Sequence, residues 1–505
     1  MIYSEDIWNE WVQKTEEDFE LKSYVHFDHP FDFHKKKREL QTLFANAGAI
    51  SRHSFLPLIK IITKTPRFKY QEDLKKYDLE TKKRPISFAS HLDTFIYGFY
   101  SFALNKKYQA FIKEKGFSDC VVAYRTDQDG KCNIQFSKET FDLIKERGSC
   151  TVLALDIKGY FDNIDHKTLK DKWSLVLGGR LNEDDYAIYR SLTKYSYVKQ
   201  VSLLKHFNLK IKGKKIKKPA SYAVLLEGES QTEKLNHVRD ANLVTTNDAH
   251  ELRGTWKRYY GIPQGSALSA LLSNIYLVDF DEYMFRLGQT MGFTYRRYCD
   301  DILIICNTRD AYSIQKTALE KISDEYFLTI QKEKVEIIEF CNNSKGQLRA
   351  FNLGKIATEL PTQMNKSNEQ LFYKSLQYLG FEYNGQKVLV RNSSVSRYFR
   401  KMRARIVKSV GMAYGKSGYS NRVFKEQIFY RYTHLGKRNF LHYVYNASKK
   451  FYRVKKGLRL GMDSPFVKRQ LSRHFEVIFK SLFTKNAKRY AFKKLNGQSV
   501  KLKQV

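Results

Sequence analysis

Two short apolar segments that border on aspartates constrain the fold of this chain more than any other feature. Thr151–Asp156 reads TVLALD and ends in a carboxylate, whereas Ile302–Cys306 reads ILIIC and directly follows Asp300 and Asp301. Apolar runs of this length, bounded by polar residues, predict buried strands. If the two strands are neighbours in one antiparallel sheet, the end of the first meets the beginning of the second. The sequence therefore predicts that Asp156 and Asp300 converge at one end of a sheet.

The chemistry of these aspartates favours a divalent cation. Carboxylate oxygens suit Mg²⁺, which keeps waters and binds substrate phosphates. Two such ions about 4 Å apart can activate a 3′-hydroxyl and stabilise the leaving pyrophosphate of an in-line displacement. Acidic turns are common in proteins, so the aspartates alone do not decide the function.

A third segment lies between the two strands and narrows the interpretation. Gly261–Leu277 reads GIPQGSALSALLSNIYL, a turn with glycine and proline that runs into a helix of small residues. Small side chains allow a nucleotide and a template to approach closely, and Gln264 offers both hydrogen-bond donors and acceptors. The three segments together favour a site for nucleotide chemistry.

The charge of the chain is concentrated in its last part. The 505 residues include 89 Lys and Arg against 53 Asp and Glu, a net charge of +36. Arg391–Val505 alone holds 30 basic residues against three acidic ones, a net charge of +27. A segment this one-sided would repel itself unless a polyanion neutralised it, and phosphate backbones are the commonest such partner. We therefore expect this region to bind nucleic acid; a merely solubilising surface is the alternative.

Several classes of protein are disfavoured by composition. No run of about 18 uncharged apolar residues predicts a membrane span, and Met1–Glu20 is acidic rather than leader-like, so we expect a cytoplasmic protein without a membrane partner. The six cysteines contain no CxxC pair, which argues against a zinc ribbon or a disulfide framework. A length of 505 residues predicts two or more packed units.

The three segments, in this order, resemble motifs A, B and C of the reverse transcriptase palm. This resemblance implies a right-hand polymerase fold of the α+β class, with fingers, a palm of antiparallel sheet plus helices, and a basic, mainly helical, thumb-like C-terminal domain. AYR at Ala123–Arg125, RHSFLPLI at Arg52–Ile59 and THLGKRNFLHYV at Thr433–Val444 are similar to the bacterial defence-associated and abortive-infection reverse transcriptases, the "unknown groups". That class implies a role in antiviral, anti-phage defence.

The resemblance also implies a division of the chain. The expected parts are an N-terminal helical extension (1–80), fingers (81–155), the palm segment with motif A (156–180), an insertion with a basic hairpin (181–256), the palm with motifs B to E (257–390), and a basic helical thumb that binds RNA (391–505).

Carried over residue by residue, the resemblance implies a catalytic centre that holds two Mg²⁺ ions. LTIQKEKVEIIEF at Leu328–Phe340 is similar to motif D, and Lys334 is the candidate for protonating pyrophosphate, with Lys332 as its rival. The implied catalytic residues are Asp156, Asp300, Asp301 and Lys334, and the implied metal ligands are Asp156, Ile157, Asp300 and Asp301.

Five further residues are implied to contact the incoming nucleotide. Phe161 matches the steric gate that excludes a ribose 2′-hydroxyl, although a plain core aromatic is the alternative. Gln264 and Gly265 belong to motif B. Arg84 in KRPISF and Arg125 in AYR look like finger contacts to triphosphate or template, with ordinary salt bridging as the alternative.

Basic residues at two places are candidates for binding nucleic acid. LKIKGKKIKK at Leu209–Lys218 predicts an exposed basic hairpin, and the others lie in the C-terminal region. The candidates are Lys210, Lys212, Lys214, Arg400, Arg403, Lys437, Arg438, Lys449 and Lys450.

The leading hypothesis is an RNA-directed DNA polymerase that makes cDNA from an associated, co-encoded noncoding RNA with deoxynucleotides and Mg²⁺. The sequence leaves the oligomeric state undecided, and a homo-oligomer is one option. One alternative is a template-independent or protein-primed deoxynucleotide polymerase. The other is a non-catalytic structural RNA-binding protein with a vestigial palm.

Overall fold

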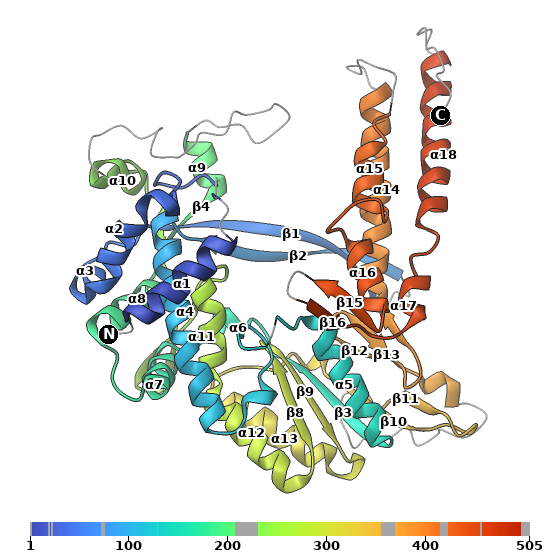
Figure 1. Ribbon diagram of the computed structural model, residues 1–505, viewed down its shortest axis with the longest axis horizontal. Helices are drawn as coiled ribbons and strands as arrows, with labels where there is room; N and C mark the ends of the chain where they lie inside the picture. The colour runs from blue at the N-terminus through green and yellow to red at the C-terminus, as the bar shows by residue number, and fades with distance from the viewer. Residues whose placement is uncertain are drawn as a thin grey trace. The chain divides into compact units, whose positions relative to one another are not determined.

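The computed structural model describes residues 3–18, 21, 24–71, 76–128, 130–207, 231–354, 369–414, 423–454 and 457–495. The chain forms two compact units, each made of several stretches of sequence. Unit 1 contains Met1–Asp127, Ala154–Ile304 and Ser313–Val335, and unit 2 contains Gln128–Leu153, Ile305–Tyr312 and Glu336–Val505. Both units mix helices with strands, which confirms the predicted α+β class (Figure 1).

The helices and strands follow the chain in this order. Those of unit 1 are α1 (Glu5–Asp18), α2 (Phe33–Ala45), α3 (Ala47–Ser51), β1 (Leu58–Gln71), β2 (Lys76–Phe88), α4 (His91–Glu114), η1 (Ser118–Cys120), α6 (Tyr160–Asn163), α7 (His166–Leu177), α8 (Glu183–Thr193), β4 (Ser196–Lys199), α9 (Gln200–His206), α10 (Gln231–Asp240), β5 (Val244–Thr246), β6 (His250–Arg253), β7 (Trp256–Tyr259), α11 (Ala267–Tyr276), α12 (Val278–Met291), β8 (Thr294–Tyr298) and η4 (Lys332–Lys334). Those of unit 2 are α5 (Asn133–Arg147), η3 (Thr308–Asp310), β10 (Glu336–Asn342), β11 (Leu348–Asn352), η5 (Glu369–Phe372), β12 (Leu376–Tyr378), β13 (Phe381–Tyr383), β14 (Val388–Val390), α14 (Asn392–Tyr414), α15 (Glu426–Tyr432), α16 (Phe440–Ser448), β15 (Phe451–Val454), β16 (Gly457–Leu460), α17 (Pro465–Arg469) and α18 (His474–Leu495). The boundary between the units falls within β3 (Cys150–Asp156), β9 (Asp301–Cys306) and α13 (Ala311–Asp324).

An aromatic cluster holds the N-terminal helices of unit 1 against α4. Trp8 and Trp11 of α1 both contact the ring of Phe99 on α4, and Trp11 meets it edge to face. Phe44 of α2 stacks on the same ring, with 4.5 Å between the centroids. Aromatic pairs in such geometries add about 0.5–1.5 kcal/mol to the stabilisation from burial alone. The start of the chain is therefore an integral layer of unit 1.

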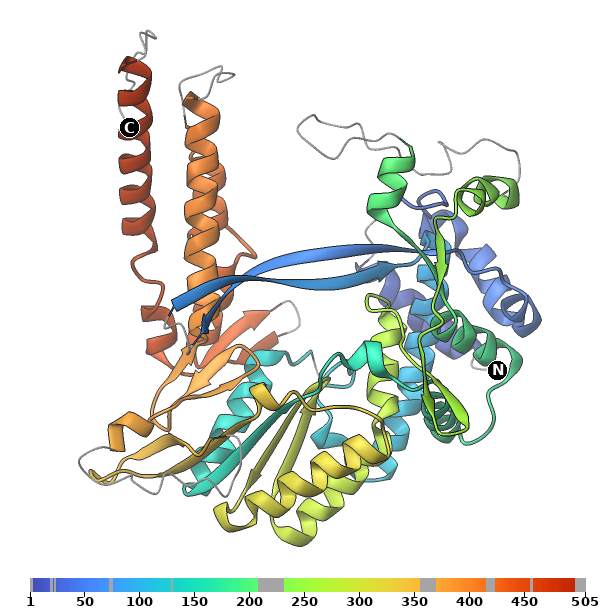
Figure 2. The same cartoon turned by 180° about the vertical axis from the view of Figure 1, so that it is seen from behind.

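A long hairpin and part of the expected insertion form one sheet in unit 1. Its strand order is β2-β1-β4-β5, with β4 parallel to β1 (Figure 2). The prediction that residues 1–80 are helical holds only as far as Ser51, because the β-branched run from Ile59 to Thr65 favours a strand. The expected insertion 181–256 likewise supplies β4 and β5 to this sheet, so those strands belong to the fold of unit 1.

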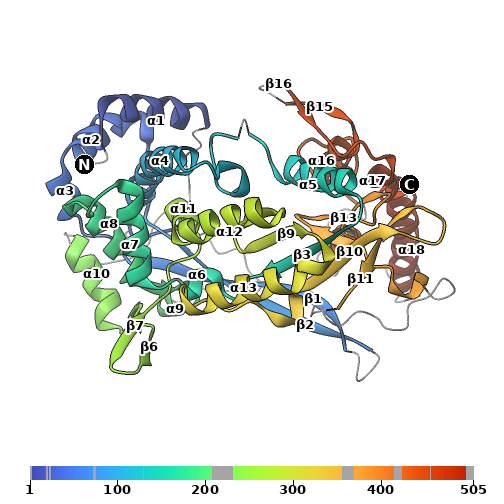
Figure 3. The ribbon, with the colours of Figure 1, turned by 90° about the horizontal axis from the view of Figure 1, so that it is seen from below.

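Each unit also contains strands that pair around β3. In unit 1, β9 lies between β3 and β8, and in unit 2, β10 lies between β11 and β3. The compact units differ from the consecutive domains expected from the sequence, because β3 and β9 each begin in one unit and end in the other. α12 contacts β8, and Figure 3 shows α12 beside the label of β9, the neighbouring strand of the same sheet.

Unit 2 carries the basic C-terminal region, which is mainly helical, as predicted. α14 and α18 pack along each other, and the hairpin β15–β16 joins the helical part to α5 (Figure 1). Gln135 of α5 donates to the hydroxyl of Tyr452 at 3.2 Å, and Asn133 donates to the carbonyl of Leu379 at 2.8 Å. None of the described helices is long and apolar enough to cross a membrane.

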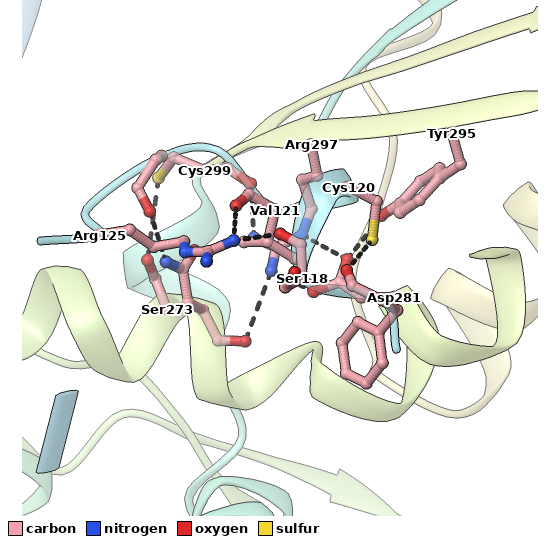
Figure 4. Close-up of polar contacts among 12 residues, drawn as sticks. Ser118, Cys120, Val121, Arg125, Ser273, Asp281, Tyr295, Arg297 and Cys299 are labelled. Carbon is pink, nitrogen blue, oxygen red and sulfur yellow. Dashed lines mark hydrogen bonds and ion pairs between the residues drawn. The ribbon is translucent and has the colours of Figure 1, made fainter. Parts of the chain in front are cut away.

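One ion pair lies completely buried in unit 1, between β8 and α12. The guanidinium of Arg297 donates to both carboxylate oxygens of Asp281, with Nε 2.7 Å from Oδ1, and both side chains are 0% exposed (Figure 4). The hydroxyl of Tyr295 donates to the same carboxylate at 2.6 Å. Burial lowers the pKa of Arg297, but the carboxylate of Asp281 outweighs it and raises that pKa well above the usual value. Burial also raises the pKa of Asp281, while the charge of Arg297 and the hydrogen bonds from Arg297 and Tyr295 act to lower it. The close bidentate contact favours the ionised pair, which is hydrogen-bonded in the core.

Removing one partner of this pair is expected to destabilise unit 1 strongly. Asp281→Asn leaves the guanidinium of Arg297 buried without a counter-charge, so the free energy of unfolding should fall by about 3–5 kcal/mol in a urea titration. The matched control is Glu282→Gln on the same helix, which removes an exposed pair with Arg286 at 2.9 Å. The control should change stability by about 1 kcal/mol or less. Equal effects of the two substitutions would contradict this account.

Candidate active site

Three aspartates lie at neighbouring strand ends in unit 1. Asp156 ends β3, Asp300 lies in the two-residue turn between β8 and β9, and Asp301 begins β9. The backbone N–H of Ile157 donates to the carbonyl of Asp300 at 3.1 Å, which ties the end of β3 to that turn. The residues expected from motifs A and C are thus brought together by strand pairing.

The turn that carries Asp300 is held from within the protein. Cys299 has a positive φ of 58°, a backbone conformation that residues other than glycine adopt rarely. Arg297 donates to the carbonyl of Cys299 at 3.0 Å (Figure 4). It also donates to the side chain of Asn274 on α11 at 3.3 Å. The buried ion pair therefore also fixes the backbone that presents the acidic turn.

Cys299 itself stays uncharged beside the carboxylates. Burial, followed by the nearby charge of Asp300, raises the pKa of the Cys299 thiol to about 12. Its sulfur lies 3.8 Å from the hydroxyl of Ser273. A neutral thiol adds no further negative charge to the aspartates.

Lys334 reaches the first aspartate. The carbonyl of Asp156 accepts a hydrogen bond from the N–H of Gln331 at 2.9 Å, which leads the chain into η4 beside the aspartate. The ammonium of Lys334 forms a salt bridge with Oδ2 of Asp156; the Asp156 side chain is 16% exposed and that of Lys334 is 42% exposed. Lys332, the rival candidate, is exposed. The structure therefore places Lys334 at the candidate site.

Two residues of motif B and the expected steric gate share a cavity. Phe161, Gln264 and Gly265 line a cavity of about 500 Å³ in unit 1. This volume falls within the range of about 300–1,000 Å³ that small-molecule sites occupy. Phe161 is partly buried, so it is part of the wall rather than a core residue alone. The other lining residues are Tyr24, Phe88, Ala89, Thr94, Tyr97, Tyr124, Ser266, Ala267 and Ala270.

The motif B turn packs tightly against the end of β2. The N–H of Ser87 donates to the carbonyl of Gln264 at 2.8 Å. Gly265 has a φ of 130°, and a Cβ on it would lie 2.3 Å from the carbonyl oxygen of Ser87. Only glycine fits this close approach of two backbones.

The two candidate arginines are used differently. Arg84 is exposed on β2. Arg125 is 3% exposed, and its guanidinium donates to Asp127 and to the carbonyls of Val121, at 3.0 Å, and Ser118 (Figure 4). These contacts correspond to the salt-bridging alternative, and the roles of both arginines toward a triphosphate stay predictions.

The candidate nucleic-acid ligands fall in two groups. Lys210, Lys212 and Lys214, with the expected basic hairpin, lie outside the described residues. The others belong to unit 2, where Arg403, Lys437, Arg438, Lys449 and Lys450 are exposed and Arg400 is partly buried. The described members therefore present cations on the surface of unit 2.

Sequence reasoning missed the residues that support the acidic turn. Asp281, Asn274 and Arg297 form the network beneath it, and Tyr124 lines the cavity. A sequence signal existed for Arg297, because an arginine inside a strand that otherwise alternates toward the core needs a buried counter-charge. Nothing in the sequence indicated that Asp281 is that counter-charge.

The residues present fit a hard divalent cation bound partly by substrate. All three candidate side chains offer oxygen only, which suits Mg²⁺. Among the described residues, no group of three or more His, Cys, Asp and Glu is already gathered closely enough to hold a metal ion. Mg²⁺ is commonly bound by one or two carboxylates together with waters and substrate phosphates, so an open arrangement is compatible with it.

The family comparison supports the assignment by motif. Residues 229–383 match the family described as Reverse transcriptase (RNA-dependent DNA polymerase). The match includes motifs B and C, whereas Asp156 and Phe161 precede it. The match assigns a reverse transcriptase domain to these residues, and the mixed helices and sheets of the chain agree with the right-hand polymerase fold predicted from its motifs. A search of curated proteins found no match.

Solved structures are similar at a low level. The chain is 11% identical to apo telomerase from Candida tropicalis truncated from its C-terminal domain, with a TM-score of 0.35. The alignment covers 72% of this chain and 61% of the telomerase chain. It is 13% identical to telomerase from Candida albicans in complex with a TWJ fragment of telomeric RNA, with a TM-score of 0.33. This alignment covers 95% of this chain and 72% of the telomerase chain. The chain thus spans less than two thirds of the first structure. TM-scores this low support no conclusion about function.

The close approach at Gly265 generates a prediction. Gly265→Ala places a Cβ against the backbone of β2 and should displace the motif B turn, lowering polymerisation about 100-fold, since misplacements of about 1 Å cost that much. The matched control is Gly116→Ala, because Gly116 also has a positive φ, of 79°, but its Cβ would meet no heavy atom of the described residues within 4 Å. Gly116→Ala should lose about 1–2 kcal/mol from the strained φ, measured by urea unfolding, and Gly265→Ala should lose more because its Cβ also clashes with the backbone of Ser87. Only Gly265→Ala should lose activity in primer extension.

Proposed function

We propose that this protein is an RNA-templated DNA polymerase that uses two Mg²⁺ ions and deoxynucleotides to make cDNA. The single observation that carries the proposal is the backbone pairing of the segments that hold motifs A, B and C in unit 1. The end of β3 is tied through Ile157 to Asp300 in the turn between β8 and β9, and Ile262 of the motif B turn donates to the carbonyl of Phe161, five residues after Asp156. The reverse transcriptase domain at residues 229–383 supports the same reaction.

In this proposal the aspartates hold the metal. Asp156 and Asp300 are the ligands, with Asp301 beside them and the backbone of Ile157 next to the site. When bound, the ions lower the pKa of a 3′-hydroxyl and stabilise charge on the departing pyrophosphate. In the structure the ammonium of Lys334 neutralises Asp156, and a divalent cation competes for the same oxygen. Lys334 would then be released toward the leaving group, where it donates a proton.

The cavity lined by Phe161 and Gln264 takes the incoming deoxynucleotide. The aromatic ring of Phe161 limits the space beside the sugar, which disfavours a 2′-hydroxyl. Gln264 is exposed in the motif B turn and can donate to and accept from the nucleotide. Tyr124 lines the same cavity as a further wall.

The template is proposed to be a bound RNA. The exposed basic residues of unit 2 and the +27 charge of Arg391–Val505 support binding to a phosphate backbone. The finer proposal, a co-encoded noncoding RNA copied in anti-phage defence, rests on the resemblance of three sequence segments to the defence-associated class.

A direct test combines the template and the active site. The wild-type protein, purified with its bound nucleic acid and given Mg²⁺ and four deoxynucleotides, should make DNA whose sequence is complementary to the bound RNA. Asp300→Ala should lower this synthesis at least about 1,000-fold, because the variant loses several kcal/mol of metal-mediated stabilisation. Asp119→Ala, an exposed carboxylate of η1, is the control and should retain activity.

The products separate the alternatives. DNA unrelated to the bound RNA, or DNA joined to protein, would replace the proposal with template-independent or protein-primed synthesis. Full activity of Asp300→Ala in cells under phage infection would favour a structural RNA-binding protein with a vestigial palm.

The steric gate is tested by ribonucleotide incorporation. Phe161→Ala removes the aromatic wall and should raise the relative kcat/KM for ribonucleotides about 10- to 100-fold, the range that a single packing contact accounts for. Tyr97, another aromatic residue of the same cavity, provides the control Tyr97→Phe, which keeps the ring. Unchanged discrimination in Phe161→Ala would show that Phe161 is a plain wall residue.

A further inference from the structure

A second cavity lies next to the proposed nucleotide cavity in unit 1. It has a volume of about 380 Å³ and lies among α1, the segment before α2, and α4. Tyr24, Thr94 and Ala267 line both cavities, so the two share part of one wall. The mechanism proposed above uses no residue that lines the second cavity alone.

The walls of this second cavity are aromatic. Trp11, Phe31, Phe95 and Phe102 line it. Phe31 and Phe95 lie with their centroids 5.0 Å apart, and Phe95 meets Trp11 edge to face at 6.4 Å. Lys14 also lines the cavity, with its ammonium 5.3 Å from the centroid of the Phe102 ring. Flat rings beside a cation are the features with which proteins bind single-stranded nucleic acid.

A buried amide group in the wall indicates a polar, planar ligand. Asn105 is 6% exposed, and its Nδ2 donates to the hydroxyl of Thr126 at 3.5 Å. Among the described residues, Oδ1 of Asn105 has no hydrogen-bond partner. A buried acceptor without a partner is destabilising, so a ligand that donates an N–H to it would recover the lost hydrogen bond. Amino and imino groups on base edges supply such donors.

A glycine keeps the cavity open. Gly98 lies inside the 24-residue helix α4 and lines the cavity. Glycine in a helix interior is unfavourable relative to alanine. A Cβ at Gly98 would meet no heavy atom of the described residues within 4 Å, so packing of those residues does not require glycine there. Any larger side chain at this position would project into the space.

We propose that this cavity binds an unstacked nucleobase of the single-stranded RNA, next to the nucleotide cavity. The aromatic walls stack on the base, Asn105 accepts from its edge, and Lys14 faces the phosphate. This proposal rests on the proposed function only in taking RNA as the source of the base. A free nucleotide offers the same chemistry, and the experiment distinguishes the two sources.

The test compares full-length variants with RNA oligonucleotides that each carry one abasic nucleotide. With the wild-type protein, one abasic position should weaken binding about 5- to 100-fold in fluorescence anisotropy, the effect of one lost stacking contact. Gly98→Leu fills the cavity, so this variant should bind intact RNA as weakly as the wild type binds the abasic RNA. In Gly98→Leu the abasic position should then cause no further loss of affinity. Gly98→Ala is the matched control and should behave like the wild type within about twofold, because a methyl group fills little of the space. Wild-type affinity and unchanged abasic sensitivity in Gly98→Leu would overturn the proposal.

A second variant covers a failure of Gly98→Leu to fold. Asn105→Leu keeps the volume of the side chain and removes the unpartnered oxygen, so its thermal midpoint should not fall, while it weakens binding at the same abasic position. If Asn105→Leu leaves that position as sensitive as in the wild type, the proposal is wrong.

Two further measurements identify the source and separate this site from the polymerase. In one outcome, adenosine monophosphate competes with RNA for the wild type but not for Gly98→Leu, and no abasic position in the RNA weakens binding. That outcome would overturn the assignment to an RNA strand and would assign the cavity to a free nucleotide. Primer extension on the same preparations tests the proposed function independently. DNA synthesis without any effect of the variants on RNA binding refutes this site alone, whereas the expected binding pattern without DNA synthesis refutes the polymerase alone.

Discussion

The buried ion pair between Arg297 and Asp281 is the interaction on which the architecture of unit 1 depends. Removing two charges from water is costly, and only the bidentate contact together with the hydroxyl of Tyr295 offsets that cost. The same guanidinium also holds the carbonyl of Cys299 and the side chain of Asn274. One side chain thus joins β8 to α11 and α12 and supports the turn that carries the candidate metal ligands.

The candidate site combines rigid backbone contacts with side chains that can move. The motif B turn is locked by the contact of Gly265 with Ser87, and the end of β3 is paired with the acidic turn. By contrast, Lys334 is partly exposed and reaches Asp156 from a short 3-10 helix. Fixed ligands and one mobile cation are a suitable arrangement for a site whose charge changes when metal and triphosphate bind.

The N-terminal segment contributes more to unit 1 than its position in the sequence suggests. Its tryptophans pack on Phe99 of α4, and Tyr24 lines the cavity that also contains Phe161 and Gln264. The ring of Tyr24 stacks on His91, with 4.3 Å between centroids. The N-terminal segment thus supplies one wall residue, Tyr24, to the cavity proposed for the nucleotide.

The sequence by itself supplied the candidate residues of the site, because short motifs carry their chemistry locally. Strand-forming runs next to Asp156 and Asp300, and a glycine turn at Gly265, can be read without knowledge of distant residues. Only the tertiary structure decided that Arg125 is held internally, that Asp281 pairs with Arg297, and that residues 58–65 and 196–199 share a sheet. These features join residues far apart in the chain, and no local propensity or spacing records which partner a buried charge or a strand edge will find.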